Sequence, residues 1–546
     1  MTHNPASNPI VPEDDPGDAL SGAEIARAAG IIMFALILAG VLGLVRQVVI
    51  AAAFGAGRDL DAFYAALRVP ETLFVLVAGG ALGSAFIPVF QRFLARDDFA
   101  GAWRLASAVF SLMSLAALAL CVVIFALAEP IVAATLTPGA DATAQALTVE
   151  LMRIMLVTVL IFGVSGLVMG ILNGYQHFTA PALAPSVYNI GLIFGAVALA
   201  PTMGVHGLAW GAVLGAGLHL FIQVPNLLRL EYFALRFWPA PRAEGVGEVL
   251  LLMGPRVLGL GVVQVNFWVN TALTSDMQPG SLTAITTAFT LMFTVLGILG
   301  QSIGTAVFPT LSRLYAENDE AGFGRYLLSS LSSVLFMSIP AGFGLAALSM
   351  PIIIVFFERG EWTRLDSAGT AWALALFSIG LAGHAVLEIL ARAFYARHDT
   401  WTPVVVGIFT MALNITLSLI LIRVFGYPET VDFARGPFGG LALAMSIATA
   451  IESTILWVLL RRRMTLQDGP VLRSATGVLF AALLMSGGLA LWLRLTAEGT
   501  PLLQLIGGVT LGAAIFGVAT LALGIPEARA VPRMVWGRLK VLVGRV

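Results

Sequence analysis

The sequence is short of charge. Only 11% of its 546 residues are Asp, Glu, Lys or Arg, against about 25% in an ordinary globular domain. Lys540 is its only lysine, so arginine carries almost all of the positive charge. The formal net charge of −1 gives no excess of either sign, and we expect no nucleic-acid partner. A soluble globular fold is excluded for most of the chain.

Cysteine and the common catalytic motifs are also missing. The single Cys121 lies in an apolar run, so no disulfide can form within the chain and no neighbouring acid or histidine could activate the thiol. The sequence has no Walker A loop, no GxSxG elbow and no HExxH motif, and its six histidines are scattered. We therefore expect neither an enzyme nor a cofactor or metal.

What the sequence has instead is long apolar runs. Hydrophobic residues make up 58% of the chain, and the mean hydropathy is +0.92. A helix needs about 20 mostly apolar residues to cross a bilayer. We expect an all-α polytopic membrane protein with about fourteen transmembrane helices, of which the second and eighth, rich in Gly and Pro, should bend. The expected spans are 28–54, 62–91, 105–128, 147–173, 180–200, 205–228, 248–274, 282–311, 327–357, 368–394, 402–424, 437–460, 474–493 and 502–525.

The arginines indicate how these spans are oriented. Alternate loops carry most of the basic residues, with twenty on one side of the membrane and six on the other. Loops rich in Lys and Arg stay in the cytoplasm, so both termini are predicted to be cytoplasmic. Residues 1–24 hold five acids and no Lys or Arg, which predicts a disordered tail rather than a signal peptide. Residues 230–247 are expected to form an amphipathic cytoplasmic linker, and 527–546 a basic cytoplasmic tail.

The chain contains an internal repeat. Residues 85–104 and 306–325 align without a gap, and eight positions are identical, including Pro88/Pro309 and Arg92/Arg313. Both segments leave the membrane on the cytoplasmic side, so the two halves should be parallel six-helix lobes, 25–229 and 248–463. Such a plan is typical of transporters that rock two lobes around a site near the midplane. The alternative is a duplicated membrane scaffold that transports nothing.

Several stretches resemble the MurJ/MviN family, the lipid II flippases of peptidoglycan synthesis, within the multidrug/oligosaccharidyl-lipid/polysaccharide exporter superfamily. They run in order from about residue 26 to 465, and they are LGLVRQVVIAAAFGAGRDLDAFYAALRVPETLF (42–74), GGALGSAFIPVF (79–90), GILNGYQHFTAPALAPSVYN (170–189), MGPRVLGLGVVQVNFWVN (253–270), GTAVFPTLSRL (304–314) and LEILARAFYARHDTWTPV (387–404).

The resemblance implies a multi-pass protein of the bacterial plasma membrane, with a V-shaped pair of lobes. Its central cavity would accept an undecaprenyl-diphosphate-linked disaccharide-pentapeptide and release it outward by alternating access. The last two helices, 464–526, would line a groove for the lipid tail. A monomer is expected, with membrane lipids and cell-wall synthesis proteins as partners. The alternatives are a flippase for another undecaprenyl-linked oligosaccharide, an exporter of a small molecule, or a scaffold for cell-wall enzymes.

Arginines inside the predicted spans are the candidates for binding a diphosphate, because a guanidinium can bind phosphate oxygens in pairs. Arg46 lies within the first span, where an uncompensated charge costs at least ~2.5 kcal/mol, and it matches a basic position of the family's cavity. An internal ion pair is its alternative role. Arg68 also matches a basic family position, but Glu71 could simply pair with it. Asp61 matches a family aspartate that could partner an arginine or cap a helix.

Other residues have two interpretations each. Arg256, after Pro255, could reach the cavity or extend to lipid phosphates. His384 and Glu388, spaced i, i+4 in the tenth span, could respond to protons, or could form a buried hydrogen-bonded pair that holds helices together. Other family members bind sodium through acids in helices seven and eleven. Asn270 and Ser418 stand at those positions here, and Asn266 and Asn414 remain as neutral oxygen donors, so sodium coupling is not expected.

The sequence departs from the family's cationic pattern at four positions. Basic or acidic residues of the family are replaced by Gly40, Phe74, Gly79 and Thr290. The predicted cavity therefore keeps mainly Arg46 and Arg68 as cations. This departure is the reason that another isoprenoid-linked substrate remains an alternative.

Overall fold

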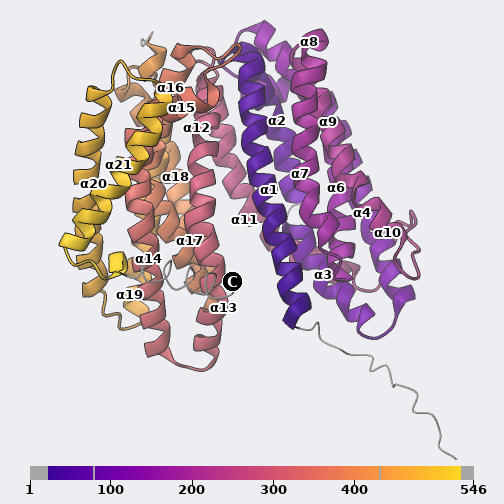
Figure 1. Cartoon of the computed structure of the whole chain (residues 1–546). Coiled ribbons are helices and arrows are strands. Elements are labelled where there is room, and N and C mark those ends of the chain that lie inside the picture. Colours follow the sequence, from indigo (N-terminus) through magenta and orange to yellow (C-terminus); the bar gives the residue numbers. More distant parts are fainter. Residues whose placement is uncertain (1–21, 78–79, 429–431, 530–546) are drawn as a thin grey trace, which may run out of the picture.

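The computed structural model describes residues 22–77, 80–428 and 432–529, and all regular structure in these ranges is helical. The helices form two lobes that lie side by side, as predicted (Figure 1). The N-lobe is drawn in indigo to purple and the C-lobe in pink to orange. Two further helices, in yellow, lie along the outer side of the C-lobe.

The N-lobe contains the first six predicted spans. Its elements are α1 (Gly22–Phe54), α2 (Arg58–Val77), α3 (Gly80–Leu94), α4 (Phe99–Ala126), α5 (Ala128–Ile131), η1 (Val132–Leu136), α6 (Ala142–Gly174), α7 (Thr179–Phe194), η2 (Gly195–Leu199), α8 (Ala200–Met203), α9 (Val205–Phe221) and α10 (Val224–Leu228).

The C-lobe and the two outer helices follow. Their elements are α11 (Val246–Thr274), α12 (Ser281–Leu296), η3 (Gly297–Gln301), α13 (Ser302–Ala316), α14 (Glu320–Ala347), α15 (Ser349–Phe357), α16 (Arg364–Ile379), α17 (Leu381–Ala396), α18 (Trp401–Val424), η4 (Phe433–Arg435), α19 (Gly439–Arg463), α20 (Gly469–Leu495) and α21 (Pro501–Ala522).

The number of membrane-spanning helices is compatible with the predicted fourteen. Within the described ranges, eleven helices are long and apolar enough to cross a bilayer, or twelve if α16 and α17, bent by 44°, form one span. The two other predicted spans coincide with α2 followed by α3 and with α11. The second span is described as α2 and α3, and residues 78–79 between them, where a bend could lie, are outside the described residues. The eighth is interrupted by the π-helical turn η3 between α12 and α13.

The predicted tails fall mostly outside the described residues. Positions 1–21 and 530–546 are not described, and residues 22–24 already belong to α1. The predicted linker contains no helix up to Gly245, after which α11 begins. Its backbone is attached to α4 instead, because Ser107 Oγ accepts from Arg236 N at 3.1 Å and Ser111 Oγ from Trp238 N at 2.6 Å.

The internal repeat is visible in the helix caps. Asp98 caps α4 by accepting from Gly101 N at 2.7 Å, and Asp319 caps α14 by accepting from Gly322 N at 2.7 Å. A Cβ on either glycine would collide with the capping carboxylate, so each aspartate requires its glycine. The residues before the caps, Asp97 and Asn318, have φ of 56° and 55°. The repeated sequence thus gives the same backbone conformation at the corresponding helix cap of each lobe.

The repeat extends beyond the segments that resemble each other in sequence. Helices α6 and α7 begin at Ala142 and Thr179, and α16 and α18 begin at Arg364 and Trp401, 222 residues later in each case. The two lobes therefore run in the same direction through the membrane, as parallel repeats do.

One buried apolar core joins the lobes. It contains residues of α1, α2 and α6 from the N-lobe and of α12, α16 and α17 from the C-lobe. A second core lies within the N-lobe around α3, α4 and α6 and reaches the start of α11. Helices α20 and α21 pack on α14 and α15 of the C-lobe. Large apolar side chains such as Phe480, Ile506 and Val518 stay exposed on them, which suits helices that face lipid.

Candidate functional site

The lobes are joined by hydrogen bonds at one end of the molecule. We call this end, formed by residues 55–57, 137–141, 275–280 and 358–363, the closed end. Asp61 of α2 reaches across to the N-terminus of α12. Its carboxylate accepts from Gly280 N and Thr283 N, both at 2.7 Å, and from Thr283 Oγ1 at 2.6 Å. Asp61 therefore caps a helix of the other lobe, where the helix dipole also favours a negative charge.

Neighbouring polar side chains extend this junction. Gln47 Nε2 of α1 donates to Tyr64 OH at 2.9 Å and to Thr287 Oγ1 of α12 at 3.2 Å. The Gln47 side chain is buried, so these bonds are made away from water, where an unmet polar group would be costly. Three helices from two lobes are thereby held in one register.

Backbone contacts close the same end. Glu361 N donates to Ala52 O at 2.9 Å, and Gly139 N donates to Ser275 Oγ at 3.1 Å. Gly360 has φ +61°, and a Cβ there would lie 2.1 Å from Ala52 O. Only glycine allows the C-lobe loop to approach α1 this closely.

Arg68 belongs to the junction between the lobes. Its guanidinium donates to Thr271 Oγ1 of α11 at 3.2 Å and to Thr286 Oγ1 of α12 at 3.4 Å. It also pairs with Glu71 at 3.2 Å and lies over the Phe267 ring, 5.2 Å from its centroid. The side chain is only 12% exposed. In this conformation the donors of Arg68 are therefore used within the protein.

Arg46 differs from Arg68 in having no acidic partner. Its Nη1 donates to Asn189 Oδ1 of α7 at 3.0 Å, and Asn189 Nδ2 donates in turn to Ala39 O at 3.3 Å. No ion pair involves Arg46 in the described part of the chain. A half-buried guanidinium held by one neutral amide has further N–H donors to offer.

The remaining predicted cations and replaced positions add little positive charge. Arg256 lies in α11, but its side chain is outside the described residues. Phe74 packs against Phe162 with ring centroids 4.7 Å apart. Thr290 donates to Thr286 O at 2.8 Å. Gly79 is not described, and a Cβ on Gly40 would meet nothing within 4 Å.

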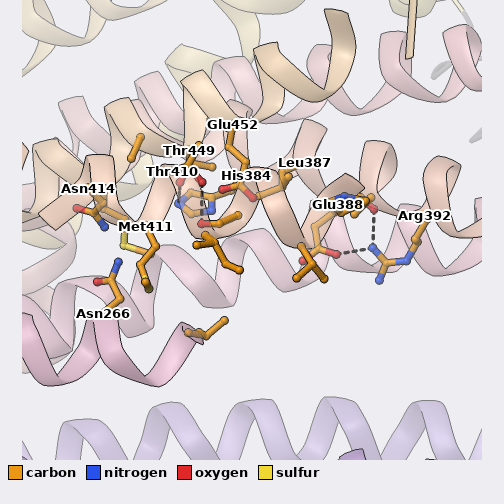
Figure 2. A pocket seen from close by; sticks show the side chains of 18 of the residues that line it. Asn266, His384, Leu387, Glu388, Arg392, Thr410, Met411, Asn414, Thr449 and Glu452 are labelled. Carbon is orange, nitrogen blue, oxygen red and sulfur yellow. Dashed lines mark hydrogen bonds and ion pairs between the residues drawn. The ribbon is translucent and has the colours of Figure 1, made fainter. Parts of the chain in front are cut away.

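A cavity of about 690 Å³ lies within the C-lobe (Figure 2). It is enclosed by α11, α13, α17, α18 and α19. Four of the five predicted coupling residues line it, although they are up to 148 positions apart in the sequence. The polar and charged residues of its wall are Asn266, His384, Glu388, Arg392, Tyr395, Thr410, Asn414, Thr449 and Glu452.

Inside the cavity, the predicted pair of His384 and Glu388 is not formed. Glu388 makes an ion pair with Arg392, one turn further along α17. His384 Nε2 lies 3.3 Å from Thr449 Oγ1 of α19. The interpretation as a buried hydrogen-bonded His–Glu pair is therefore wrong, because the Glu388 carboxylate pairs with the guanidinium of Arg392 instead. A response of these residues to protons stays a prediction.

The asparagines form short neutral contacts. Asn270 Nδ2 donates to Asn266 Oδ1 at 3.1 Å, and Ser418 Oγ donates to Asn414 Oδ1 at 3.2 Å. Asn270 does not line the cavity itself. No group of three or more His, Cys, Asp or Glu side chains suited to a metal occurs among the described residues. These contacts are uncharged hydrogen bonds between neighbouring turns of one helix.

Two charged residues of the cavity were missed from the sequence. Arg392 was counted with the cytoplasmic arginines although it falls inside the predicted span 368–394, and it lies within α17 and lines the cavity. Glu452 was not considered, although it falls inside the predicted span 437–460. An acid within a membrane span is itself a signal of function, and that signal was available.

A second, apolar cavity of about 390 Å³ lies between the C-lobe and the outer helices. Its wall is made by α12, α14, α15, α20 and α21, with residues such as Pro340, Leu348, Met485 and Phe516. No charged residue lines it. The space suits a hydrocarbon chain better than a polar group.

Two parallel six-helix lobes, joined at one end around polar membrane-embedded residues, define a polytopic membrane transporter. A family model described as "Lipid II flippase MurJ" matches residues 50–508. The chain belongs to the MurJ family. It is a transporter rather than an enzyme, and a multi-pass protein of the bacterial inner membrane.

Relatives of known name agree with this assignment. The chain is 30% identical to the lipid II flippase MurJ of Burkholderia cenocepacia over 85% of its own length and 89% of the relative's. It is also 30% identical to a probable lipid II flippase MurJ of Vibrio cholerae, over 91% and 96% of the two lengths.

Solved structures show the same fold. A structure titled "Lipid II flippase MurJ, inward closed conformation" superposes with a TM-score of 0.75 and 26% identity, covering 90% of this chain and 99% of the other. An inward-facing MATE-family multidrug transporter of the MOP superfamily gives a TM-score of 0.64 at 16% identity, covering 79% and 98%. The second likeness concerns the fold alone.

Proposed function

We propose that this chain moves lipid II from the inner to the outer leaflet by alternating access. The closed end faces outward, both termini are cytoplasmic, and a substrate enters from the opposite end, where the lobes lie further apart in Figure 1. Membership of the MurJ family and the names of the relatives support lipid II as the substrate. Because one chain carries both lobes, the transport unit is a monomer. Contacts with cell-wall synthesis proteins belong to the same proposal.

The observation that carries the proposal is the state of Arg46. A half-buried arginine in a membrane helix is expensive unless an acid or a ligand compensates its charge. Asn189 satisfies one donor and leaves the charge unbalanced. A diphosphate would balance it and accept two N–H groups at once. Arg68 could join the same anion once the lobes separate and Thr271 and Thr286 release it.

The lipid part of the substrate needs a separate place. The apolar cavity beside α20 and α21 is suited to an isoprenoid chain, since its lining is almost wholly hydrocarbon. In this arrangement residues 464–526 hold the tail while the head group passes between the lobes.

The proposal is tested by replacing the host's own flippase. Cells depleted of their lipid II flippase should survive on this chain and expose lipid II on the outer leaflet. Arg46→Ala should reduce outward lipid II about 10- to 100-fold, because a charged hydrogen bond contributes about 1.5–3 kcal/mol. Arg494→Ala, at an exposed arginine on α20, is the matched control and should transport normally. Normal transport by Arg46→Ala at equal membrane expression would refute the role of this cation.

A second candidate is the transport of another undecaprenyl-linked oligosaccharide. It is favoured by the neutral contacts of Phe74 and Thr290 at positions where the family carries cations. Purified protein in liposomes would move such a lipid faster than lipid II if this alternative holds, and the depleted host would not be rescued.

A further inference from the structure

Glu452 is a membrane-embedded acid that faces the C-lobe cavity. It lies near the middle of α19, and its side chain approaches α18, where a Cβ on Gly407 would be 3.5 Å from Glu452 Oε1. Figure 2 places it beside Thr410 and Thr449, on the same wall as His384. The carboxyl group is half-buried, so water in the cavity can reach it.

No cation balances Glu452. The other acid of the cavity, Glu388, is neutralised by Arg392, whereas no ion pair involves Glu452 in the described ranges. The titratable or charged groups that face this cavity are His384, Glu388, Arg392 and Tyr395, all of α17. Among the described side chains, its walls from α11, α13 and α18 contribute neutral ones only. An ionised Glu452 would therefore be solvated by cavity water and would have no ion pair among the described residues.

A neighbouring hydroxyl group, that of Thr410, is a polar partner of the carboxyl group. A threonine has one O–H donor and can accept two hydrogen bonds. Thr410 Oγ1 directs that donor to the backbone, at 3.0 Å from Val406 O and 3.2 Å from Gly407 O. The Glu452 carboxyl group thus meets a neutral hydroxyl group and the water of the cavity, through which a proton can enter and leave.

We propose that Glu452 takes up and releases one proton in each transport cycle, and that inward proton movement drives the outward movement of lipid II. This inference rests on the proposed function. When the cavity faces the outside, a proton from water converts the carboxylate to the neutral acid. When the lobes return to the conformation described here, the acid releases that proton to water on the inner side. No other reactant is needed.

The coupling is tested with the full chain in liposomes that contain lipid II. The membrane potential is set to zero with valinomycin and potassium, and the ratio of lipid II in the two leaflets is measured with and without a pH gradient. One pH unit changes proton occupancy by a factor of about ten, so a gradient of about one unit should shift the wild-type ratio by up to about tenfold. Glu452→Gln should show no shift, and Glu452→Asp should restore it.

The control is Glu498→Gln, which removes an exposed acid in the loop between α20 and α21 and should respond to the gradient as wild type does. The proposal is overturned if Glu452→Gln also responds normally, or if the wild-type chain moves lipid II but ignores the gradient. If Glu388→Gln alone loses the response to the pH gradient, Glu388 carries the proton instead, and the proposal for Glu452 is equally overturned.

A second measurement does not depend on transport. Infrared difference spectra of the folded protein should show a protonated carboxyl band that appears on acidification in wild type and is missing from Glu452→Gln. If the wild-type chain moves no lipid II, the proposed function fails, and these spectra still decide whether Glu452 binds a proton. An identical band in both proteins refutes the site.

Discussion

At the residue scale, the most informative side chain is Asp61. From the sequence it could have partnered an arginine or capped its own helix. In the structure it caps α12, a helix that begins more than 200 residues later, with three hydrogen bonds. Its carboxylate thereby closes the proposed outward end. Arg68 contributes to the same junction, which leaves Arg46 as the cation available to a substrate.

Removing Asp61 should open the closed end. Asp61→Ala leaves three donors of α12 without an acceptor, and hydrogen bonds to a charged group contribute about 1.5–3 kcal/mol each. A cysteine at Ser281, which is 1% exposed, should then react with a maleimide at least about tenfold faster. The background is Cys121→Ser, and the rate is followed by mass spectrometry.

The matched control is Asp59→Ala, which removes an exposed acid from the same first turn of α2. It should leave the labelling rate unchanged. Equal rates for Asp61→Ala and Asp59→Ala would mean that the cap does not hold the lobes together.

At the scale of elements, the two matching helix caps explain why α4 and α14 begin with the same backbone conformation in their lobes. The caps Asp98 and Asp319 fix the entry to α4 and α14, and each requires a glycine three residues later. The halves then diverge in what covers these corners. In the N-lobe the irregular segment 229–245 lies across α4 and is attached by Ser107 and Ser111.

Removing both hydroxyl groups should release this segment. In Ser107→Ala/Ser111→Ala, the linker loses two side-chain acceptors for its backbone N–H groups, each contributing about 1 kcal/mol. Trypsin should therefore cleave at Arg236 or Arg242 about tenfold or more faster than in wild type. Limited proteolysis of the reconstituted protein measures this rate, with Ser114→Ala on the same helix as control. An unchanged cleavage rate would show that other contacts hold the linker.

At the scale of the whole molecule, hydrogen bonds join the lobes at the closed end, and at the opposite end the start of α11 packs on α3, where Glu248 pairs with Arg92. The hydrogen bonds of Asp61 and Gln47 and the bond from Glu361 N to Ala52 O lie at the closed end. Alternating access requires this end to separate and the opposite end to approach. The closed end should therefore be a gate rather than a permanent joint.

A cross-link across the closed end should stop transport. A Cβ built on Gly139 lies 2.3 Å from Asp276 Cβ of the other lobe, so a slight separation reaches the ~3.8 Å of a disulfide. Gly139→Cys/Asp276→Cys, in a Cys121→Ser background, should lose lipid II transport on oxidation and regain it on reduction. The single variants under oxidation are the controls. Transport that continues with the disulfide formed would exclude opening at this end.

Much of the fold could be predicted from the sequence. The apolar runs located the helices, and the identities around Pro88 and Pro309 revealed the repeat, because hydrophobicity and chain direction are local properties. The contacts of the candidate functional site were harder to predict. Of the coupling residues, His384, Glu388, Asn266 and Asn414 were named and do share a cavity. The pairing of Glu388 with Arg392 was not foreseen, because Arg392 was counted with the cytoplasmic arginines although it lies inside the predicted tenth span.

By itself, the sequence determined that this protein is a duplicated helical membrane transporter of the MurJ family. Bilayer insertion and family motifs depend on residues close together in the chain. Only the tertiary structure decided which polar groups meet. It placed Asp61 on the N-terminus of α12 and used donors of Arg68 for hydrogen bonds to threonines of the other lobe. It also left Arg46 and Glu452 without a charged partner among the described residues. Such contacts join residues more than a hundred positions apart, and helix packing alone brings them together.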